Sequence, residues 1–222
     1  MAAKQRFIAK ERRPVVVYRG AYEGKEQERQ YLYHLKSLIF SCEGRKRDVD
    51  FIFVSACGGG PISVVERAVR VPLFYPREQT RTAIFDYDGK TEEFKKALDC
   101  CKDQDIEYTY TNYCFDLWLI LHKKRFIRSI VNPKEYEREI KTLYNIPPNA
   151  DIKSHGIMER IIAQITLSDI KFAIQNGQAI SLHQDQVGTP LFTDKSIKYY
   201  NNPDLLIHRF VEKVLKDTGC LS

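Results

Sequence analysis

Apolar segments rich in β-branched residues alternate with segments of helical periodicity through the first half of the 222-residue sequence. Strands joined by helices at this spacing indicate βαβ units, and therefore a parallel sheet. We predict an α/β fold in which residues 14–111 form one mostly parallel sheet of about four strands flanked by helices. The expected strands cover residues 15–18, 50–55, 81–85 and 106–111, and the expected helices cover 26–40, 62–71 and 91–101.

The second half of the sequence has a different pattern, in which helical segments dominate. Four large apolar residues between positions 115 and 121 predict a short helix pinned against the core, because exposing them all to water would be costly; they are Phe115, Leu117, Trp118 and Leu121. Further helices are expected near 133–144, 153–177 and 204–215, with a polar loop before the last. We therefore divide the chain into a basic arm (1–13), an α/β core (14–125) and a helical C-terminal part packed on the core (126–222).

Composition excludes several classes of protein. Hydrophobic residues make up 43% and charged residues 29% of the chain, which is typical of a globular protein and not of a disordered or fibrous one. No run approaches the ~18 apolar residues of a membrane-spanning helix, and the first residues have no apolar signal-peptide core. Six cysteines without a CxxC pair favour neither a zinc site nor a disulfide framework. We expect a cytoplasmic protein without membrane contact.

Basic residues are concentrated in two places and give the chain a net charge of +6. One is the N-terminal arm, and the other is the group Lys123, Lys124, Arg125 and Arg128. Local positive charge of this kind favours a polyanion such as DNA or RNA as partner. A solvated basic surface explains the same pattern, and the composition alone leaves both interpretations open.

Acidic residues stand where two expected strands end. Asp86 and Asp88 follow the third strand, and residues two apart in an extended segment point to the same side. Glu23-Gly24 follows the first strand, with Glu28 on the next helix, as further metal-binding or catalytic candidates. Mg²⁺ or Mn²⁺ suits such sparse carboxylate ligands. The alternatives are a helix-capping turn at Asp86-x-Asp88 and a solvated charge run around Glu23.

Two further segments are candidates for binding substrate. Gly58, Gly59 and Gly60 precede a helix, where free amides can cradle a phosphate, although a tight turn gives the same pattern. His122 ends the apolar helix beside the basic group and could hold a phosphate or move a proton. A buried histidine at an interface between elements is the alternative.

Several segments together resemble the RloB family of Toprim-like proteins, which are found beside restriction and phage-defence genes. The family pattern of a strand, Glu-Gly, and then Glu and Tyr in the next helix is matched by Glu23-Gly24, Glu28 and Tyr31. The family Asp-x-Asp resembles Asp86-Tyr87-Asp88. The most specific resemblance is the block Asn112 to His122, and the ending around Asn202-Pro203 and His208 is also similar.

The resemblance implies a Toprim-like fold in which one glutamate and an Asp-x-Asp pair bind Mg²⁺ for phosphodiester chemistry. On this basis Glu23, Asp86 and Asp88 are the expected metal ligands, and Asn112 joins the substrate-binding candidates with Lys123 and Arg125. The sequence departs from the family at Tyr113, where the family has proline, and at Asp116, where it has glutamate. In an alternative alignment of the first strand, Arg19 takes the place of the family glutamate.

The resulting hypothesis is a Mg²⁺-dependent nuclease of a prokaryotic anti-phage system that acts on DNA or RNA. The alternative is a catalytically degenerate nucleic-acid binder, or a regulatory subunit that docks on a partner ATPase. Candidate partners are therefore nucleic acid, a companion ATPase implied by the resemblance, and further copies of the same chain.

Overall fold

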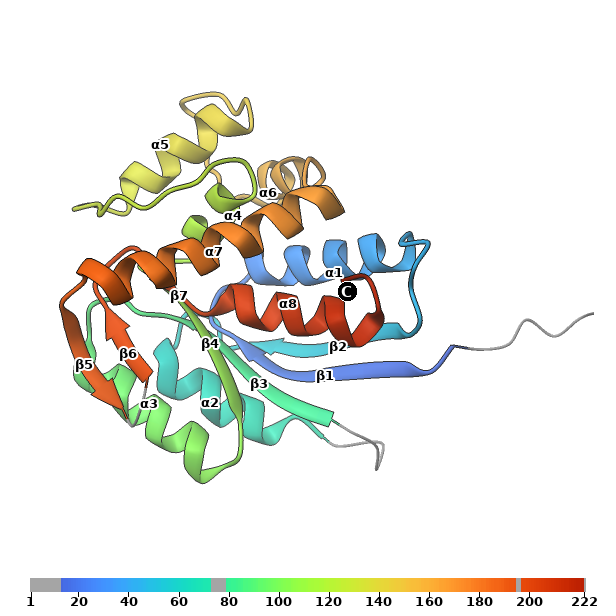
Figure 1. Cartoon of the computed structure of the whole chain (residues 1–222), viewed down its shortest axis with the longest axis horizontal. Coiled ribbons are helices and arrows are strands. Elements are labelled where there is room, and N and C mark those ends of the chain that lie inside the picture. Colours follow the sequence, from blue (N-terminus) through green and yellow to red (C-terminus); the bar gives the residue numbers. More distant parts are fainter. Residues whose placement is uncertain (1–12, 73–78, 195–196, 222) are drawn as a thin grey trace, which may run out of the picture.

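A five-stranded sheet of order β2-β1-β3-β4-β7 forms the centre of the computed structural model, which describes residues 13–72, 79–194 and 197–221 (Figure 1). The first four strands are parallel and β7 is antiparallel to β4. The predicted mostly parallel sheet is confirmed, as is the position of Asp86 at the carboxyl end of a central strand. The strands are β1 (Val15–Tyr22), β2 (Asp48–Ser55), β3 (Gln79–Asp86), β4 (Glu107–Asn112) and β7 (Asp204–Leu205).

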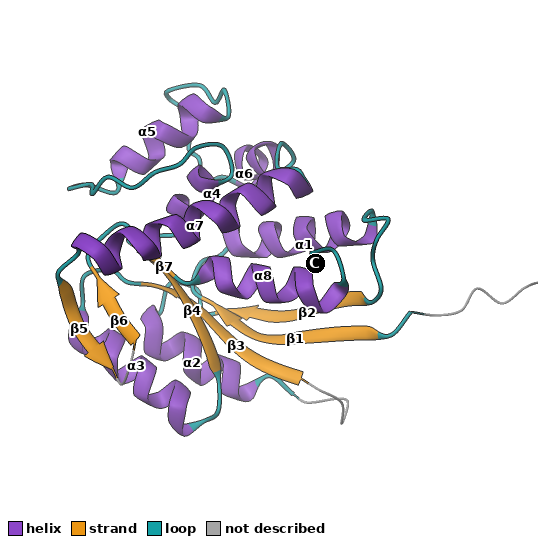
Figure 2. Ribbon diagram, viewed as in Figure 1, coloured by secondary structure: helices purple, strands orange, loops and turns teal. Residues whose placement is uncertain are grey.

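Helices cover both faces of this sheet (Figure 2). The two faces are lined by separate apolar clusters, because successive side chains of a strand point to opposite sides. Ala83 and Phe85 of β3 belong to one cluster, and Ile84 between them belongs to the other. One face carries α2 (Gly60–Arg70) and α3 (Thr91–Asp103), and the other carries α1 (Gln27–Phe40), α4 (Asp116–Leu121) and α8 (Ile207–Thr218).

The chain between α4 and β7 is mostly helical, as predicted, but its elements differ in detail. One helix was predicted near 153–177, whereas Thr166 begins a new helix there through a reciprocal capping box with Asp169. The predicted polar loop before the last helix contains a two-stranded hairpin. The elements are α5 (Lys134–Leu143), α6 (His155–Ile162), α7 (Leu167–Val187), β5 (Pro190–Asp194) and β6 (Ile197–Tyr200).

The C-terminal segment belongs to the sheet rather than to the helical part alone. Asp204 and Leu205, predicted as the start of a helix, pair with β4 instead, and the helix begins at Ile207. Tyr18 of β1 packs edge-on against Phe210 of α8, and its hydroxyl donates to Asp217 at 2.5 Å. Most of the predicted basic arm, residues 1–12, lies outside the described residues.

The short helix α4 is the centre of the larger apolar cluster. Leu117, Trp118 and Leu121 are fully buried and Phe115 is 2% exposed, which confirms that these side chains pack into the core. The indole ring of Trp118 meets the ring of Tyr31 on α1 edge-on, with the centroids 6.2 Å apart. Trp118 therefore connects α4 to the helix that follows β1.

We predict that Trp118→Ala lowers the free energy of unfolding by about 3–5 kcal/mol, because it opens a cavity in a packed core. Chemical denaturation of both proteins measures the difference. Tyr33→Ala is the matched control, since Tyr33 is 64% exposed and its loss should change stability by less than about 0.5 kcal/mol. A loss below about 1 kcal/mol for Trp118→Ala would contradict this account of α4.

Candidate metal centre

The strand pairing brings Glu23 and Asp86 together at one edge of the sheet. Glu23 follows β1 directly and Asp86 ends the adjacent parallel strand β3. The Glu23 amide donates to the Ile84 carbonyl at 3.0 Å, which extends the pairing by one residue. The Glu23 Oε2 atom accepts a hydrogen bond from the Asp86 amide at 2.9 Å, and Asp88 lies exposed two residues further on. Glu23 and Asp86 therefore adjoin at the carboxyl ends of β1 and β3, with Asp88 two residues beyond.

Arg19, the alternative to Glu23, lies inside β1 instead of at its end. It pairs in register with Ile52 of β2 and Arg81 of β3, and it is fully buried. Its guanidinium donates to the carbonyl of Pro72. Arg19 therefore cannot occupy the position at the strand end where Glu23 stands.

Glu28 is the fourth predicted acidic residue, and the short turn before α1 directs it to the same place. It is 3% exposed, and its Oε1 atom accepts from the Gly24 amide at 3.0 Å. A Cβ atom on Gly24 would stand 2.3 Å from the Glu28 Oε2 atom, so any other residue at position 24 would displace this carboxylate. This close approach explains why glycine follows Glu23.

Asp116 belongs to the same acidic group, although the sequence analysis did not count it among the ligands. It lies in the first turn of α4, is 4% exposed, and accepts a hydrogen bond from Gln27 of α1 at 2.6 Å. The available signal was its place in the block from Asn112 to His122. Burial raises the pKa of Glu28, and the nearby charge of Asp116 raises it further. This proximity depends on how α1 and α4 pack.

The carboxylates repel one another, and burial increases the effect. Burial raises the pKa of Asp86 well above its ordinary value, and the neighbouring charges of Glu28, Glu23 and Asp88 raise it further. Burial likewise raises the pKa of Glu23 to about 6, against the opposing hydrogen bond from the Asp86 amide. The protein around Glu23 and Asp86 therefore stabilises their ionised forms less well than water does.

One cation from the helical part reaches this acidic group. Lys153 lies exposed in the loop between α5 and α6, and its charge opposes the raised pKa of Glu28, Asp88 and Asp116. Its ammonium has no ion pair within the described part of the chain. Sequence analysis missed Lys153 because nothing local distinguishes it from other surface lysines.

The donor atoms are of the type that a hard divalent cation prefers. Each of the three carboxylates, Glu23, Glu28 and Asp86, uses one oxygen in a hydrogen bond to another residue. The second oxygen of Glu28, Oε2, is buried without a hydrogen-bond partner among the residues that the structure describes. Over residues 13–72, 79–194 and 197–221, no three or more His, Cys, Asp or Glu side chains form a group that could hold a metal ion. A cation bound by one or two carboxylates and water, as Mg²⁺ often is, needs no such group.

Two of the three glycine amides that were predicted to bind phosphate are engaged by the backbone. The Gly58 amide donates to the Glu23 carbonyl at 2.8 Å, and the Gly59 amide donates to Ala56 at 3.2 Å, so neither is available to an anion. A Cβ atom on Gly60 would stand 2.6 Å from a carboxylate oxygen of Glu93. The loop instead supports the backbone at Glu23, which is the tight-turn alternative.

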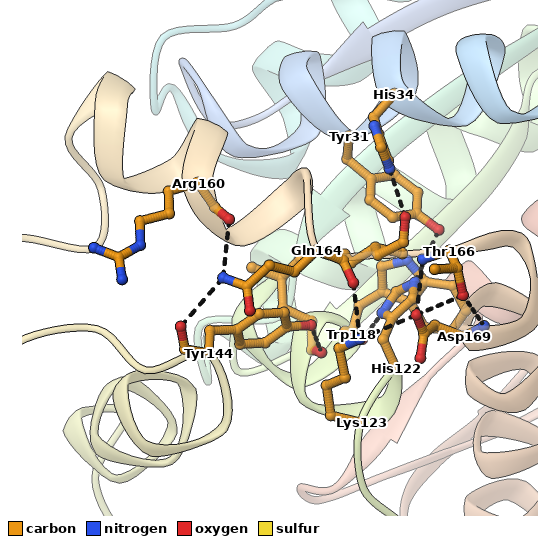
Figure 3. Close-up of polar contacts among 12 residues, drawn as sticks. Tyr31, His34, Trp118, His122, Lys123, Tyr144, Arg160, Gln164, Thr166 and Asp169 are labelled. Atoms are coloured by element: carbon orange, nitrogen blue, oxygen red, sulfur yellow. Dashed lines mark hydrogen bonds and ion pairs between the residues drawn. The ribbon is translucent and has the colours of Figure 1, made fainter.

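Asn112 and His122 are structural rather than exposed to a substrate. Asn112 is 1% exposed and donates to the Tyr200 carbonyl at 3.2 Å. His122 is fully buried, with Nδ1 2.8 Å from the Trp118 carbonyl and Nε2 3.2 Å from the Tyr31 hydroxyl (Figure 3). Burial lowers its pKa to about 4, so it is neutral near pH 7 and holds no phosphate.

Of the basic group, Lys123 is also engaged within the protein. Its ammonium lies 3.0 Å from Asp169 and donates to the Gln164 carbonyl at 2.8 Å, which ties α4 to the start of α7 (Figure 3). Arg125 is exposed and remains available to a ligand. Lys123 and Arg125, both predicted to bind substrate, therefore differ: Lys123 is engaged by other residues that the structure describes, and Arg125 is not.

These features define the class of the protein as a mixed α/β protein with an acidic centre at the carboxyl ends of its parallel strands. A family model described as RloB-like protein matches residues 21–214, and the chain belongs to the RloB-like family. Comparisons with curated proteins and with solved structures each found no match. Within the described residues, no helix is long and apolar enough to cross a membrane.

We predict that Glu23→Gln stabilises the protein at pH 7.5 without divalent cations by about 2 kcal/mol. The pKa of Glu23 rises from 4.5 to about 6 on folding, so the folded state binds this proton more tightly than the unfolded state. The wild type therefore loses stability as pH rises through 6, whereas the glutamine variant does not.

Denaturation curves between pH 4 and 8 measure this difference. The gap between the variant and the wild type should close toward pH 4, where Glu23 is protonated in both states. Glu66→Gln, at an exposed glutamate of α2, is the control and should show no pH-dependent gap. A gap that is independent of pH would contradict the raised pKa of Glu23.

Proposed function

We propose that this RloB-like protein is a Mg²⁺-dependent nuclease, Toprim-like in its chemistry, that hydrolyses phosphodiester bonds in DNA or RNA. The observation that carries the proposal is the meeting of Glu23 and Asp86 at the ends of adjacent parallel strands, joined by a hydrogen bond of 2.9 Å. Family membership supports the further proposal of a cytoplasmic role in anti-phage defence.

Each acidic residue has a distinct part in this proposal. Glu23 and Asp86 would hold the cation, and the Asp86 amide and the Thr111 hydroxyl keep the two carboxylates in place. Asp88 is exposed, so it would orient the attacking water or hold a second ion. Mg²⁺ or Mn²⁺ supplies the polarisation of the phosphate and of the attacking water.

Glu28 is more deeply buried than Glu23, at 3% against 8% exposed, and Asp88 is exposed. Burial raises its pKa, and one of its oxygens has no hydrogen-bond partner among the described residues. In this proposal it is the general base that accepts a proton from water during hydrolysis. Asp116 and Gln27 fix the α1–α4 contact beside it.

A second candidate is a nucleic-acid-binding or regulatory subunit that does not cut and that docks on a companion ATPase. The observation in its favour is that the Glu23 Oε2 atom is already bonded to a backbone amide, while no three-residue metal group occurs in the described residues. The two functions differ in whether cleavage follows binding.

We predict that Asp86→Asn lowers Mg²⁺-dependent cleavage at least about a hundredfold, because the metal contributes several kcal/mol to the transition state. The assay incubates purified protein with mixed DNA and RNA pools in Mg²⁺, Mn²⁺ or EDTA, alone and with any companion ATPase. Circular dichroism should show an unchanged fold, since asparagine keeps the shape of aspartate.

Asp99→Asn is the matched control, because Asp99 has a 71% exposed side chain and lies on α3. It should cut as fast as the wild type. If Asp86→Asn also cuts at the wild-type rate, the catalytic proposal fails. If no protein cuts but all bind nucleic acid in a salt-dependent way, the second candidate is correct.

A further inference from the structure

A groove of about 710 Å³ lies along α5 and the loop that follows it. It lies on the helix that packs against α4, and α4 carries Asp116 of the acidic centre. The Tyr136 hydroxyl also donates to the carbonyl of Asn112, at the end of β4, at 3.4 Å. The groove is lined by Lys134, Glu137, Arg138, Lys141, Thr142, Asn145, Ile146 and Pro148.

Most charged side chains in this groove are basic, and two of them have no ion pair among the described residues. Lys141 is held by Glu137 at 2.6 Å and by the Pro148 carbonyl at 2.8 Å, so this acid is neutralised within the wall. Lys134 and Arg138, one helical turn apart, are exposed, and their side chains have no ion pair or hydrogen bond to any described residue. The groove therefore offers two free cations on one face of α5.

The loop that forms one wall of the groove also carries Lys153. From Pro148 the chain continues to Lys153, and two residues further on His155 Nδ1 lies 2.9 Å from Glu26 Oε2, at the start of α1 and two residues before Glu28. One short segment thus connects the groove to the acidic centre. Cations in this arrangement suit a polyanion that crosses the centre and continues along α5.

The lining of the groove indicates how such a polyanion is held. It contains no aromatic side chain among its described residues, whereas proteins that bind single strands use aromatic rings on which bases stack. Lysine and arginine without such rings contact phosphates and carry no sequence information. The groove is therefore suited to the outer backbone of a duplex.

We propose that Lys134 and Arg138 bind the phosphate backbone of a nucleic-acid duplex, and that Lys153 guides the next phosphates to the acidic centre. This inference rests on the proposed function, because it treats the acidic centre as the place where the strand is cut. It assigns the substrate to a surface that lies outside the block from Asn112 to His122.

The test measures binding without cleavage, by fluorescence anisotropy in EDTA over a range of KCl concentrations. The probes are labelled duplex DNA, duplex RNA and the corresponding single strands. Lys134→Gln/Arg138→Gln is compared with the wild type and with Arg67→Gln/Arg70→Gln. The control pair consists of exposed arginines that line a groove at α2, on the opposite face of the sheet.

For duplex probes, the α5 variant should bind more weakly, and its slope of log affinity against log salt should be shallower by about 2. The α2 variant should match the wild type. The preferred duplex, DNA or RNA, identifies the substrate backbone. Lys153→Gln should lower the cleavage rate more than it lowers affinity.

Three results would overturn the inference: an unchanged slope for the α5 variant, a loss of slope for the α2 variant only, or binding of single strands alone. Absence of salt-dependent binding by the wild type would overturn it as well. Failure of the proposed function is seen separately. In that case the wild type binds through α5 but cuts nothing in Mg²⁺ or Mn²⁺.

Discussion

The parallel pairing of β1 with β3 is the constraint on which the rest of the structure depends. It sets Tyr22 opposite Ile84, so Glu23, one residue after Tyr22, and Asp86, two residues after Ile84, emerge at the same edge. The hydrogen bond from the Asp86 amide to the Glu23 carboxylate then holds the Glu23 side chain in place at the end of β1. Because β1 and β3 lie inside the sheet, neither strand can shift without breaking pairs on both sides.

The acidic centre is held in place by interactions that have no part in its chemistry. Carboxylates that raise one another's pKa oppose folding, so other contacts must hold α1 and α4 against the sheet. Trp118, Tyr31 and His122 supply these contacts as a buried cluster of rings between the two helices. Lys123 extends the same support to α7 through its ion pair with Asp169. The block that most resembles the family therefore works largely through packing.

The parts of the fold that were predicted correctly are those with strong local patterns. The β-branched runs and the glycine and aspartate that follow them mark β1 to β4, and the position of Asp86 follows from them. Local sequence did not decide between Arg19 and Glu23, because β1 continues four residues beyond its apolar run, to Tyr22. The strand β7 has only two residues, so it is too short to show the alternation of apolar and polar residues that marks a strand. Asp116 and Lys153 join the centre through helix packing, which no spacing along the chain reveals, and the burial of His122 depends on the same packing.

The order in which β4 and β7 occur in the chain has a consequence for synthesis. β7 covers the outer edge of β4, yet residues 113–203 separate the two strands. At the usual pace of translation this interval lasts about 5–18 s, during which one edge of the nascent sheet has no neighbour. The contact of Tyr18 with Phe210 and Asp217 likewise joins the first strand to the last helix. The sheet is therefore completed only after the ribosome has made β7, long after it has made β4.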